Sequence, residues 1–281
     1  MRPVVVNAAL TGMVPMRSDS PCVPITPREI GLDVERVVAA GASIVHLHAR
    51  DDDGAPTWRR ERYAEILDEV RSRCPEVIVC VSTSGRNFPD LERRADVLGL
   101  DGDLKPDMAS LTLGSLNFPR QASVNEPAVI RGLAERMAER GIVPELEAFD
   151  LGMLDYARYL IERDVLRPPF YVNVLLGSLG TLAASPLNLA LCVQSLPADA
   201  VWAATGIGRF QLEVNGLALA MGGGVRVGLE DNLWLDEERT ELATNEALVE
   251  RAVGIATALG RTIASPRDVR AELGLGELSP A

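Results

Sequence analysis

The 281-residue sequence predicts an α/β fold, a (β/α)8 TIM barrel formed by a single domain. Two observations support this prediction: short apolar segments recur along the whole chain, and each is followed by an amphipathic segment with helical periodicity. The length also fits one such barrel, and no linker divides residues 1–281. The expected strands are 3–9, 43–49, 76–83, 107–113, 143–149, 169–176, 200–206 and 225–230.

The matching helices are expected at 27–40, 58–73, 88–98, 123–140, 151–163, 185–195, 209–221 and 244–259. The first is the best marked, because Thr26 can be its N-cap, Pro27 suits its first turn, Glu29 completes a capping box and Gly41 ends it. The chain after about residue 262 lies beyond the last helix. We expect this C-terminal extension to pack outside the barrel or on a neighbouring subunit.

The composition argues against nucleic-acid and membrane partners. The 28 basic and 40 acidic residues give a net charge of -12, which repels nucleic acids and anionic membranes. No apolar run reaches the roughly 18 residues of a membrane helix. The four cysteines form no C-x-x-C pair, and the first residues lack a signal peptide's apolar core. These features predict a reduced, cytoplasmic protein.

Lysine usage argues against one class of carbon chemistry. The single lysine, Lys105, precedes a proline, which favours a loop or strand entry over a buried strand end. A Schiff-base aldolase needs a desolvated lysine in its site. Carbon chemistry in this chain would therefore need a metal.

The strand at 43–49 carries the only two histidines of the chain, His46 and His48. Alternate side chains of a strand point to one face, so both imidazoles can share one divalent ion. A catalytic zinc usually has three protein ligands and one open position, so a third ligand must come from elsewhere. Taken alone, the pair is explained equally well as two histidines that form hydrogen bonds inside the barrel.

The last strand supplies a candidate for that third ligand. Alternation along 225–230 points Arg226, Gly228 and Glu230 inward, at the strand ends where barrel active sites gather. Two histidines and Glu230 with an open position would make a Lewis acid that stabilises an enolate. Asp231 beside it could be a general base. The alternative for both acids is helix capping or an exposed loop.

Further inward positions are polar, which indicates a site within the barrel. Each has an ordinary alternative, such as a hydrogen-bonded Ser or Thr, or a Glu paired with an arginine. Glu147 is our choice as the second acid/base because it lies nearer the strand's carboxyl end than Glu145. The inward polar residues are Ser82, Ser84, Ser110, Thr112, Glu145, Glu147 and Asn173.

Glycine-rich segments follow the sixth and seventh strands, at 176–181 and 205–209. Barrels often bind phosphate near strands seven and eight, and free amides at a helix start attract anions. Tight turns are the ordinary alternative. The candidate phosphate-binding residues are Gly177, Ser178, Gly206, Gly208 and Arg209.

Six segments occur in order along nearly the whole chain and are specific in combination. They are NAALTG at 7–12, VPITP at 23–27, HLHARD at 46–51, LGSLNF at 113–118, PELEAFD at 144–150 and GVRVGLEDN at 224–232. The chain thereby resembles the β-keto acid cleavage enzymes, formerly a domain of unknown function and typified by the enzyme that cleaves 3-keto-5-aminohexanoate.

The resemblance implies a zinc-dependent TIM barrel, a homodimer or homotetramer, that converts a β-keto acid and acetyl-CoA into acetoacetate and a new acyl-CoA. It implies Claisen and retro-Claisen steps at one site. By the same resemblance His46, His48 and Glu230 would bind Zn²⁺, and Arg226 with Asp231 would form a catalytic dyad. The residues that would contact the substrate are Thr11, Val14, Ser82, Thr112 and Asn117.

The loop after the first strand departs from the family member that resembles this chain. That enzyme binds the substrate ammonium with a glutamate where this chain has Val14. A buried, unpaired ammonium is costly, so we expect a β-keto acid without a primary ammonium and with an uncharged, aliphatic tail. Arg17 leaves a dicarboxylic keto acid open.

Three rival functions follow from the same residues. A zinc amidohydrolase would need histidines on later strands, which this chain lacks. A metal-dependent aldolase or acyl-CoA lyase would share enolate stabilisation without a second thioester. A catalytically silent metabolite-binding barrel is the third, and a polar interior with an open metal position argues against it.

Overall fold

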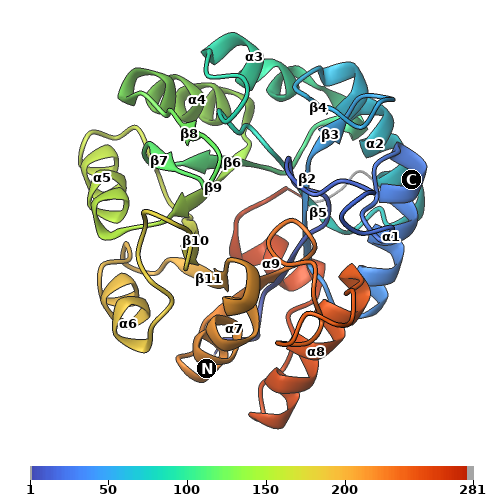
Figure 1. Ribbon diagram of the computed structural model, residues 1–281. Helices are drawn as coiled ribbons and strands as arrows, with labels where there is room; N and C mark the ends of the chain where they lie inside the picture. The colour runs from blue at the N-terminus through green and yellow to red at the C-terminus, as the bar shows by residue number, and fades with distance from the viewer. Residues whose placement is uncertain (1, 277–281) are drawn as a thin grey trace.

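Eight parallel strands form a closed barrel in the computed structural model, which describes residues 2–276 (Figure 1). Their order around the barrel is β1, β12, β11, β10, β9, β6, β5 and β2. The predicted fold class is confirmed, and every predicted strand is present with somewhat shorter limits. The strands are β1 (Val6–Ala9), β2 (Ile44–Leu47), β5 (Ile78–Val81), β6 (Met108–Thr112), β9 (Val143–Ala148), β10 (Tyr171–Leu176), β11 (Val201–Gly206) and β12 (Gly224–Val227).

A ring of helices surrounds these strands (Figure 1). They are α1 (Pro27–Ala39), α2 (Arg60–Arg73), α3 (Leu91–Ala95), α4 (Pro127–Arg140), α5 (Leu151–Glu162), α6 (Pro186–Gln194), α7 (Gln211–Ala220) and α8 (Asn245–Ala258). The helix predicted at 88–98 is shorter, because Asp90 accepts a hydrogen bond from the Arg93 amide and caps α3 there. Two 3-10 turns, Asp96–Gly99 and Gly102–Leu104, follow it.

Two short hairpins were not predicted. The first pairs β3 (Ala49–Arg50) with β4 (Pro56–Thr57), and the second pairs β7 (Leu116–Asn117) with β8 (Ala122–Ser123). The second replaces the start of the helix predicted at 123–140, which begins only at Pro127, where proline suits the first turn. Both hairpins follow strands of the barrel and therefore extend its carboxyl end.

The capping box predicted for α1 is present. The Thr26 hydroxyl accepts from the Glu29 amide at 3.3 Å, and the Glu29 carboxylate accepts from the Thr26 amide at 2.9 Å.

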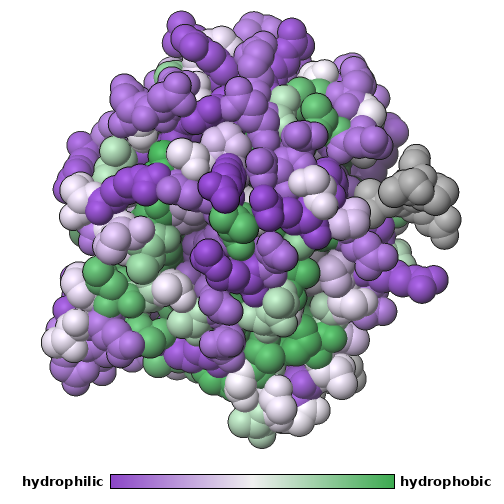
Figure 2. Space-filling model, turned by 90° about the vertical axis from the view of Figure 1, so that its right-hand side faces the viewer, coloured by the Kyte–Doolittle hydropathy of each residue, from purple (hydrophilic) through white to green (hydrophobic). Residues whose placement is uncertain are grey.

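Figure 2 shows the side of the molecule on which α1 and α8 lie, where hydrophilic side chains prevail in the upper half and apolar ones gather in the lower half. In the described residues, no helix is both long and apolar enough to cross a membrane.

The C-terminal extension forms α9 (Pro266–Glu272), which crosses the centre of the view in Figure 1. Val269 and Leu273 are fully buried against the first inward side chains of several strands, among them Ile44 and Met108. The extension thus lies outside the ring of strands, as expected, but it closes the amino-terminal end of its own barrel. Asp107 fixes it there by accepting a hydrogen bond from Arg270 at 2.8 Å.

This closure predicts that α9 unfolds together with the barrel. Replacing Leu273, which is 0% exposed, by Ala leaves a cavity and is expected to lower the free energy of unfolding by about 2–5 kcal/mol. Urea denaturation followed by tryptophan fluorescence measures this. Leu259→Ala, at a side chain that is 50% exposed, is the matched control and should cost at most about 0.5 kcal/mol. Equal effects of the two substitutions would contradict the structural role of α9.

Candidate metal centre and active site

A cavity of about 680 Å³ opens at the carboxyl end of the barrel. Its size suits a small organic molecule. Residues at or just beyond the ends of several strands line it, which is where barrel enzymes place their chemistry. The lining residues include His46, His48, Ser82, Thr112, Glu147, Arg226, Glu230 and Asp231.

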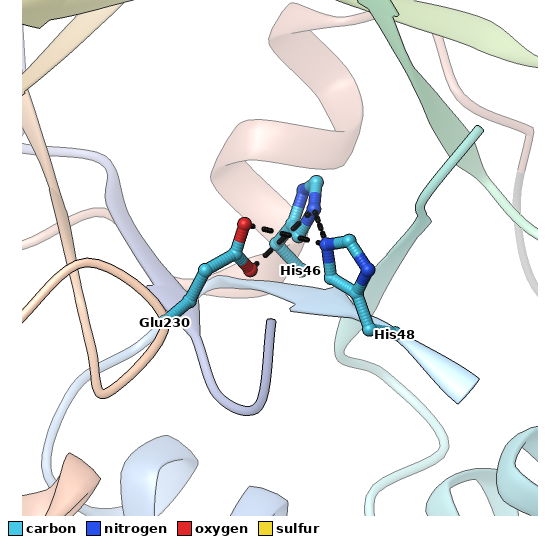
Figure 3. A group of neighbouring side chains, drawn as sticks. All are labelled: His46, His48 and Glu230. Carbon is cyan, nitrogen blue, oxygen red and sulfur yellow. Dashed lines mark hydrogen bonds and ion pairs between the residues drawn. The ribbon is translucent and has the colours of Figure 1, made fainter. Parts of the chain in front are cut away.

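His46, His48 and Glu230 point toward one another at the base of this cavity (Figure 3). The two histidine Nε2 atoms are 3.3 Å apart, and His48 Nε2 lies 3.3 Å from a Glu230 oxygen. The turn that carries Glu230 packs directly on β1, since a Cβ at Gly228 would lie 2.0 Å from the Ala9 carbonyl oxygen, which also accepts from the Glu230 amide at 3.2 Å. The sequence-predicted set therefore converges in space.

The spacing of these atoms fits zinc. Four ligands at about 2.0–2.1 Å in a tetrahedron are separated by roughly 3.3 Å. The two Nε2 atoms are 3.3 Å apart, His48 Nε2 lies 3.3 Å from Glu230 Oε1, and His46 Nε2 lies 3.8 Å from Glu230 Oε2. The Glu230 Oε2 atom is buried and has no hydrogen-bond partner among the described residues. A cation at this point would satisfy that oxygen.

Glu145 orients His46 from behind. Its carboxylate lies 2.6 Å from His46 Nδ1 and also accepts hydrogen bonds from the amides of Asn7 and Asn173. Burial alone would raise the pKa of Glu145, but the nearby His46 and Arg226 charges outweigh it and lower the pKa to about 2. A carboxylate on the far nitrogen of a ligating histidine fixes the ring and its tautomer.

Glu147, one inward position further along β9, faces the cavity instead. It accepts hydrogen bonds from the Thr112 hydroxyl at 2.7 Å and from Arg226 at 3.1 Å. Burial raises the pKa of Glu147 despite the opposing charge of Arg226. The two acids therefore lie in different layers of the barrel, and the acid nearer the carboxyl end of the strand is the one in contact with the cavity.

A second group, His46, Cys80 and Glu145, also has its ligand atoms close together. The Cys80 thiol donates to Glu145 at 3.2 Å, and burial raises its pKa well above the ordinary value. Metals bind the thiolate, so a neutral thiol is a poor ligand. Cys80 and Glu145 are fully buried and do not line the cavity, whereas the triad with Glu230 does.

Arg226 is the centre of a buried ionic cluster. Its guanidinium donates to Asp231 at 2.9 Å, Glu230 at 2.8 Å and Glu147 at 3.1 Å, and it lies 4.0 Å from Glu145. Four carboxylates thus surround one guanidinium, and a divalent cation beside them would offset the surplus negative charge. Burial raises the pKa of Asp231 despite the Arg226 charge.

Three of the other sequence-predicted residues lie outside the cavity lining. Thr11 is fully buried and its hydroxyl donates to the Pro24 carbonyl at 2.9 Å. Asn117 is exposed in β7, and Gly206 lies so close to Phe210 that a Cβ there would meet the Phe210 carbonyl oxygen at 2.1 Å. Thr11 thus lies in the loop after β1, Asn117 in the β7 strand of a hairpin and Gly206 at the end of β11.

Arg17 also lies outside the lining. Its guanidinium donates to Glu29 at 2.5 Å, so α1 already provides its counter-charge. Val14 does line the cavity and is 51% exposed.

The glycine segments reach the cavity through Gly177, Ser178, Gly208 and Arg209. Gly177 and Gly208 adopt positive φ angles of 84° and 62°, so both are turn glycines. The Gly208 amide is not free, because it donates to the Asp231 carbonyl at 2.7 Å. This hydrogen bond links the loop after β11 to the backbone of Asp231.

Several arginines and an aromatic side chain of the lining were not among the predicted site residues. Arg120 and Arg239 are exposed there like Arg209, and Arg86 stacks on Phe118 with 3.6 Å between the guanidinium carbon and the ring centroid. They lie in loops whose side-chain directions follow no strand or helix period. No signal in the sequence marks them.

Comparisons with known proteins identify related sequences. A family model described as beta-keto acid cleavage enzyme matches residues 3–275. The 3-keto-5-aminohexanoate cleavage enzyme of Fusobacterium nucleatum is 38% identical over 277 residues, which cover 98% of this chain and 99% of that protein. The 3-oxoadipate:acetyl-CoA acetyltransferase of Cupriavidus necator is 36% identical over 277 residues, covering 98% and 95%.

The solved structures support the fold. The apo structure of ObcA superimposes with a TM-score of 0.80 at 24% identity and covers 92% of this chain, which spans 66% of that protein. At this identity the likeness shows the barrel alone.

Proposed function

The chain belongs to the beta-keto acid cleavage enzyme family, and on that premise we propose that it condenses a β-keto acid with acetyl-CoA to give acetoacetate and a new acyl-CoA. One observation carries the proposal. The open side of the His46, His48 and Glu230 triad and the Arg226–Asp231 pair share the wall of one cavity.

The triad would hold Zn²⁺, with Glu145 orienting His46. When bound, the ion would act as a Lewis acid that stabilises the negative charge of an enolate. Ser82 lines the cavity and can donate a hydrogen bond to the carboxylate of the keto acid. Thr112 lines the same cavity, but its hydroxyl proton is donated to Glu147, so Thr112 can only accept a hydrogen bond from the substrate. Val14 presents no acid to an ammonium, which supports a substrate without a primary amine.

Asp231 would move the proton. It would take a proton from the carbon between the ketone and the carboxylate, and that carbon attacks the acetyl thioester and releases CoA thiolate. The thiolate adds to the original ketone, and the bond between that ketone carbon and the attacking carbon breaks. Asp231 would return its proton to the carbon of acetoacetate, and Arg226 holds the carboxylate in place through its 2.9 Å hydrogen bond.

The rim of the cavity supports acetyl-CoA as the co-substrate. Arg120, Arg209 and Arg239 are exposed there, and no carboxylate of residues 2–276 forms an ion pair with them. Phosphate groups bind readily to such arginines. Gly177, Ser178 and Gly208 lie in the same wall.

The outer face of α6 and α7 supports a homodimer or homotetramer. Leu187 and Leu191, four residues apart on α6, are 68% and 37% exposed, and Leu212 is 43% exposed on α7, the helix that packs against α6. Neighbouring exposed apolar side chains indicate a protein interface. Sedimentation equilibrium would give the subunit number.

Carbon-labelled acetyl-CoA tests the proposed reaction. With a panel of β-keto acids, we expect the labelled acetyl group to appear in acetoacetate and the unlabelled acyl group in the new acyl-CoA. Mass spectrometry of both products measures this. Cleavage that proceeds without acetyl-CoA, or unlabelled acetoacetate, would instead indicate an aldolase or acyl-CoA lyase.

A further inference from the structure

Arg86 is a partly buried cation without a counter-ion. It follows β5 and lines the cavity. Among residues 2–276, no carboxylate lies within 4.0 Å of its guanidinium, and its buried Nε atom has no hydrogen-bond partner. Arg226, by contrast, is surrounded by carboxylates. A charge withdrawn from water without a partner is costly, so its retention needs an explanation.

The surroundings hold Arg86 ready for a ligand. The Phe118 ring lies 3.6 Å from its guanidinium carbon and covers one face of the group. Ser84 and Gln121 line the cavity beside it, and Gln121 donates to the Arg86 carbonyl oxygen at 3.3 Å. The stacked guanidinium therefore keeps its donor edge free for an acceptor.

A second arginine supports this loop from beneath. Arg94 is 2% exposed, and its Nε atom donates to the Thr83 carbonyl at 2.8 Å. A Cβ at Gly85 would lie 2.7 Å from Arg94 Nη1, so glycine is needed for this close approach. Both terminal nitrogens of Arg94 lack a partner among the described residues. The loop at 82–86 thus has positive charge both at its surface and below it.

The ligand at Arg86 should be an anion near the reacting atoms. Burial lowers the pKa of Arg86, and the negative charges of three acids oppose this effect, although none of the acids pairs with it. These acids are Glu230, Glu147 and Asp231. The phosphates of CoA are separated from its thioester by the whole pantetheine arm, so they cannot reach this point while the thioester reacts. In a β-keto acid a single carbon separates the carboxylate from the ketone. With the ketone at the metal triad, this carboxylate would therefore lie beside the triad as well. What remains is a group on the substrate's tail.

We propose that Arg86 binds a second carboxylate at the far end of the β-keto acid, so that the substrate is a dicarboxylic β-keto acid. This inference rests on the proposed function. It amends the sequence-based expectation of an uncharged tail and assigns to Arg86 the role that the sequence left open for Arg17. An arginine pairs with a carboxylate through two parallel hydrogen bonds, which gives both affinity and selectivity.

The test compares two substrates of equal chain length, 3-oxoadipate and 3-oxohexanoate, with saturating acetyl-CoA. The wild-type enzyme is expected to prefer the dicarboxylate. Arg86→Met removes the guanidinium and keeps an unbranched apolar side chain beside Phe118, and should lower kcat/KM for 3-oxoadipate by about 10–100-fold, the range of a charge-assisted hydrogen bond. For 3-oxohexanoate we expect a change below about threefold.

Two further variants make the result specific. Arg93→Met removes an exposed arginine of α3 that lies outside the cavity and should change neither value. Arg86→Lys keeps the charge and should restore part of the activity toward 3-oxoadipate; it also serves if Arg86→Met fails to fold.

The outcomes separate this inference from the proposed function. Equal losses with both substrates, or a change confined to the KM for acetyl-CoA, would overturn the assignment of Arg86. Wild-type preference for 3-oxohexanoate would also overturn it, while labelled acetoacetate from any β-keto acid would leave the proposed function standing. Absence of acetoacetate from every β-keto acid would refute the proposed function itself.

Discussion

Replacing His48 by Ala is expected to remove bound zinc and to lower turnover by at least about 1,000-fold, because the Lewis acid supplies several kcal/mol of stabilisation. His48 belongs only to the group with His46 and Glu230, whereas Cys80 belongs only to the group with His46 and Glu145. Cys80→Ala should therefore keep both zinc and turnover. Metal content after dialysis and initial rates with acetyl-CoA measure the two effects.

Glu145→Gln provides a graded companion to this pair. It removes the negative charge from the far nitrogen of His46 and keeps the shape of the side chain. Loss of such an outer partner is expected to weaken metal binding by about 10–100-fold. Turnover that survives the loss of zinc, or zinc lost from Cys80→Ala but retained by His48→Ala, would contradict the assigned metal site.

Replacing Arg226 by Met is expected to lower the free energy of unfolding by about 3–5 kcal/mol, because it leaves buried carboxylates without their shared counter-charge. The folded-state pKa values of those acids should then rise above their unfolded values. Stability from such groups is present at low pH and lost as pH rises through the folded pKa. The deficit should therefore be larger at pH 8 than at pH 5.5 in urea denaturation.

Asp231→Asn is the contrasting variant. Three carboxylates still surround Arg226, and the Asn oxygen can still accept its hydrogen bond, so the free energy of unfolding should change by only about 1 kcal/mol. Turnover should fall by about 100- to 10,000-fold, the usual contribution of a general base. If Arg226→Met were as stable as Asp231→Asn at pH 8, the guanidinium would not be the centre of the cluster.

The barrel was predictable because its signals are local. Each strand is an apolar run that recurs at a regular interval, and α1 has a complete capping box within its first residues. The β7–β8 hairpin was missed because its strands are two residues long and carry no period. The predicted start of α4 failed for the same reason, since the hairpin occupies 122–123.

The candidate metal ligands were predictable because alternation along a strand fixes the direction of each side chain. His46 lies on β2 and His48 directly follows it, whereas Glu230 lies in the turn after β12; both strands border β1, so the three side chains meet at the carboxyl end of the barrel. The sequence could not distinguish the surroundings of Glu145 from those of Glu147, because strand alternation points both side chains inward. Only depth in the barrel distinguishes a buried partner of His46 from an acid that faces the cavity.

The sequence by itself determined the barrel, the candidate metal ligands and the resemblance to one family, because these depend on periodicity and on motifs of neighbouring residues. The tertiary structure decided how the residues divide their roles. Arg17 forms an ion pair with Glu29, α9 packs against the amino-terminal end of its own barrel, and Arg86 of one loop stacks on Phe118 of another. Contacts between loops distant in the chain follow no period, so only the folded arrangement reveals them.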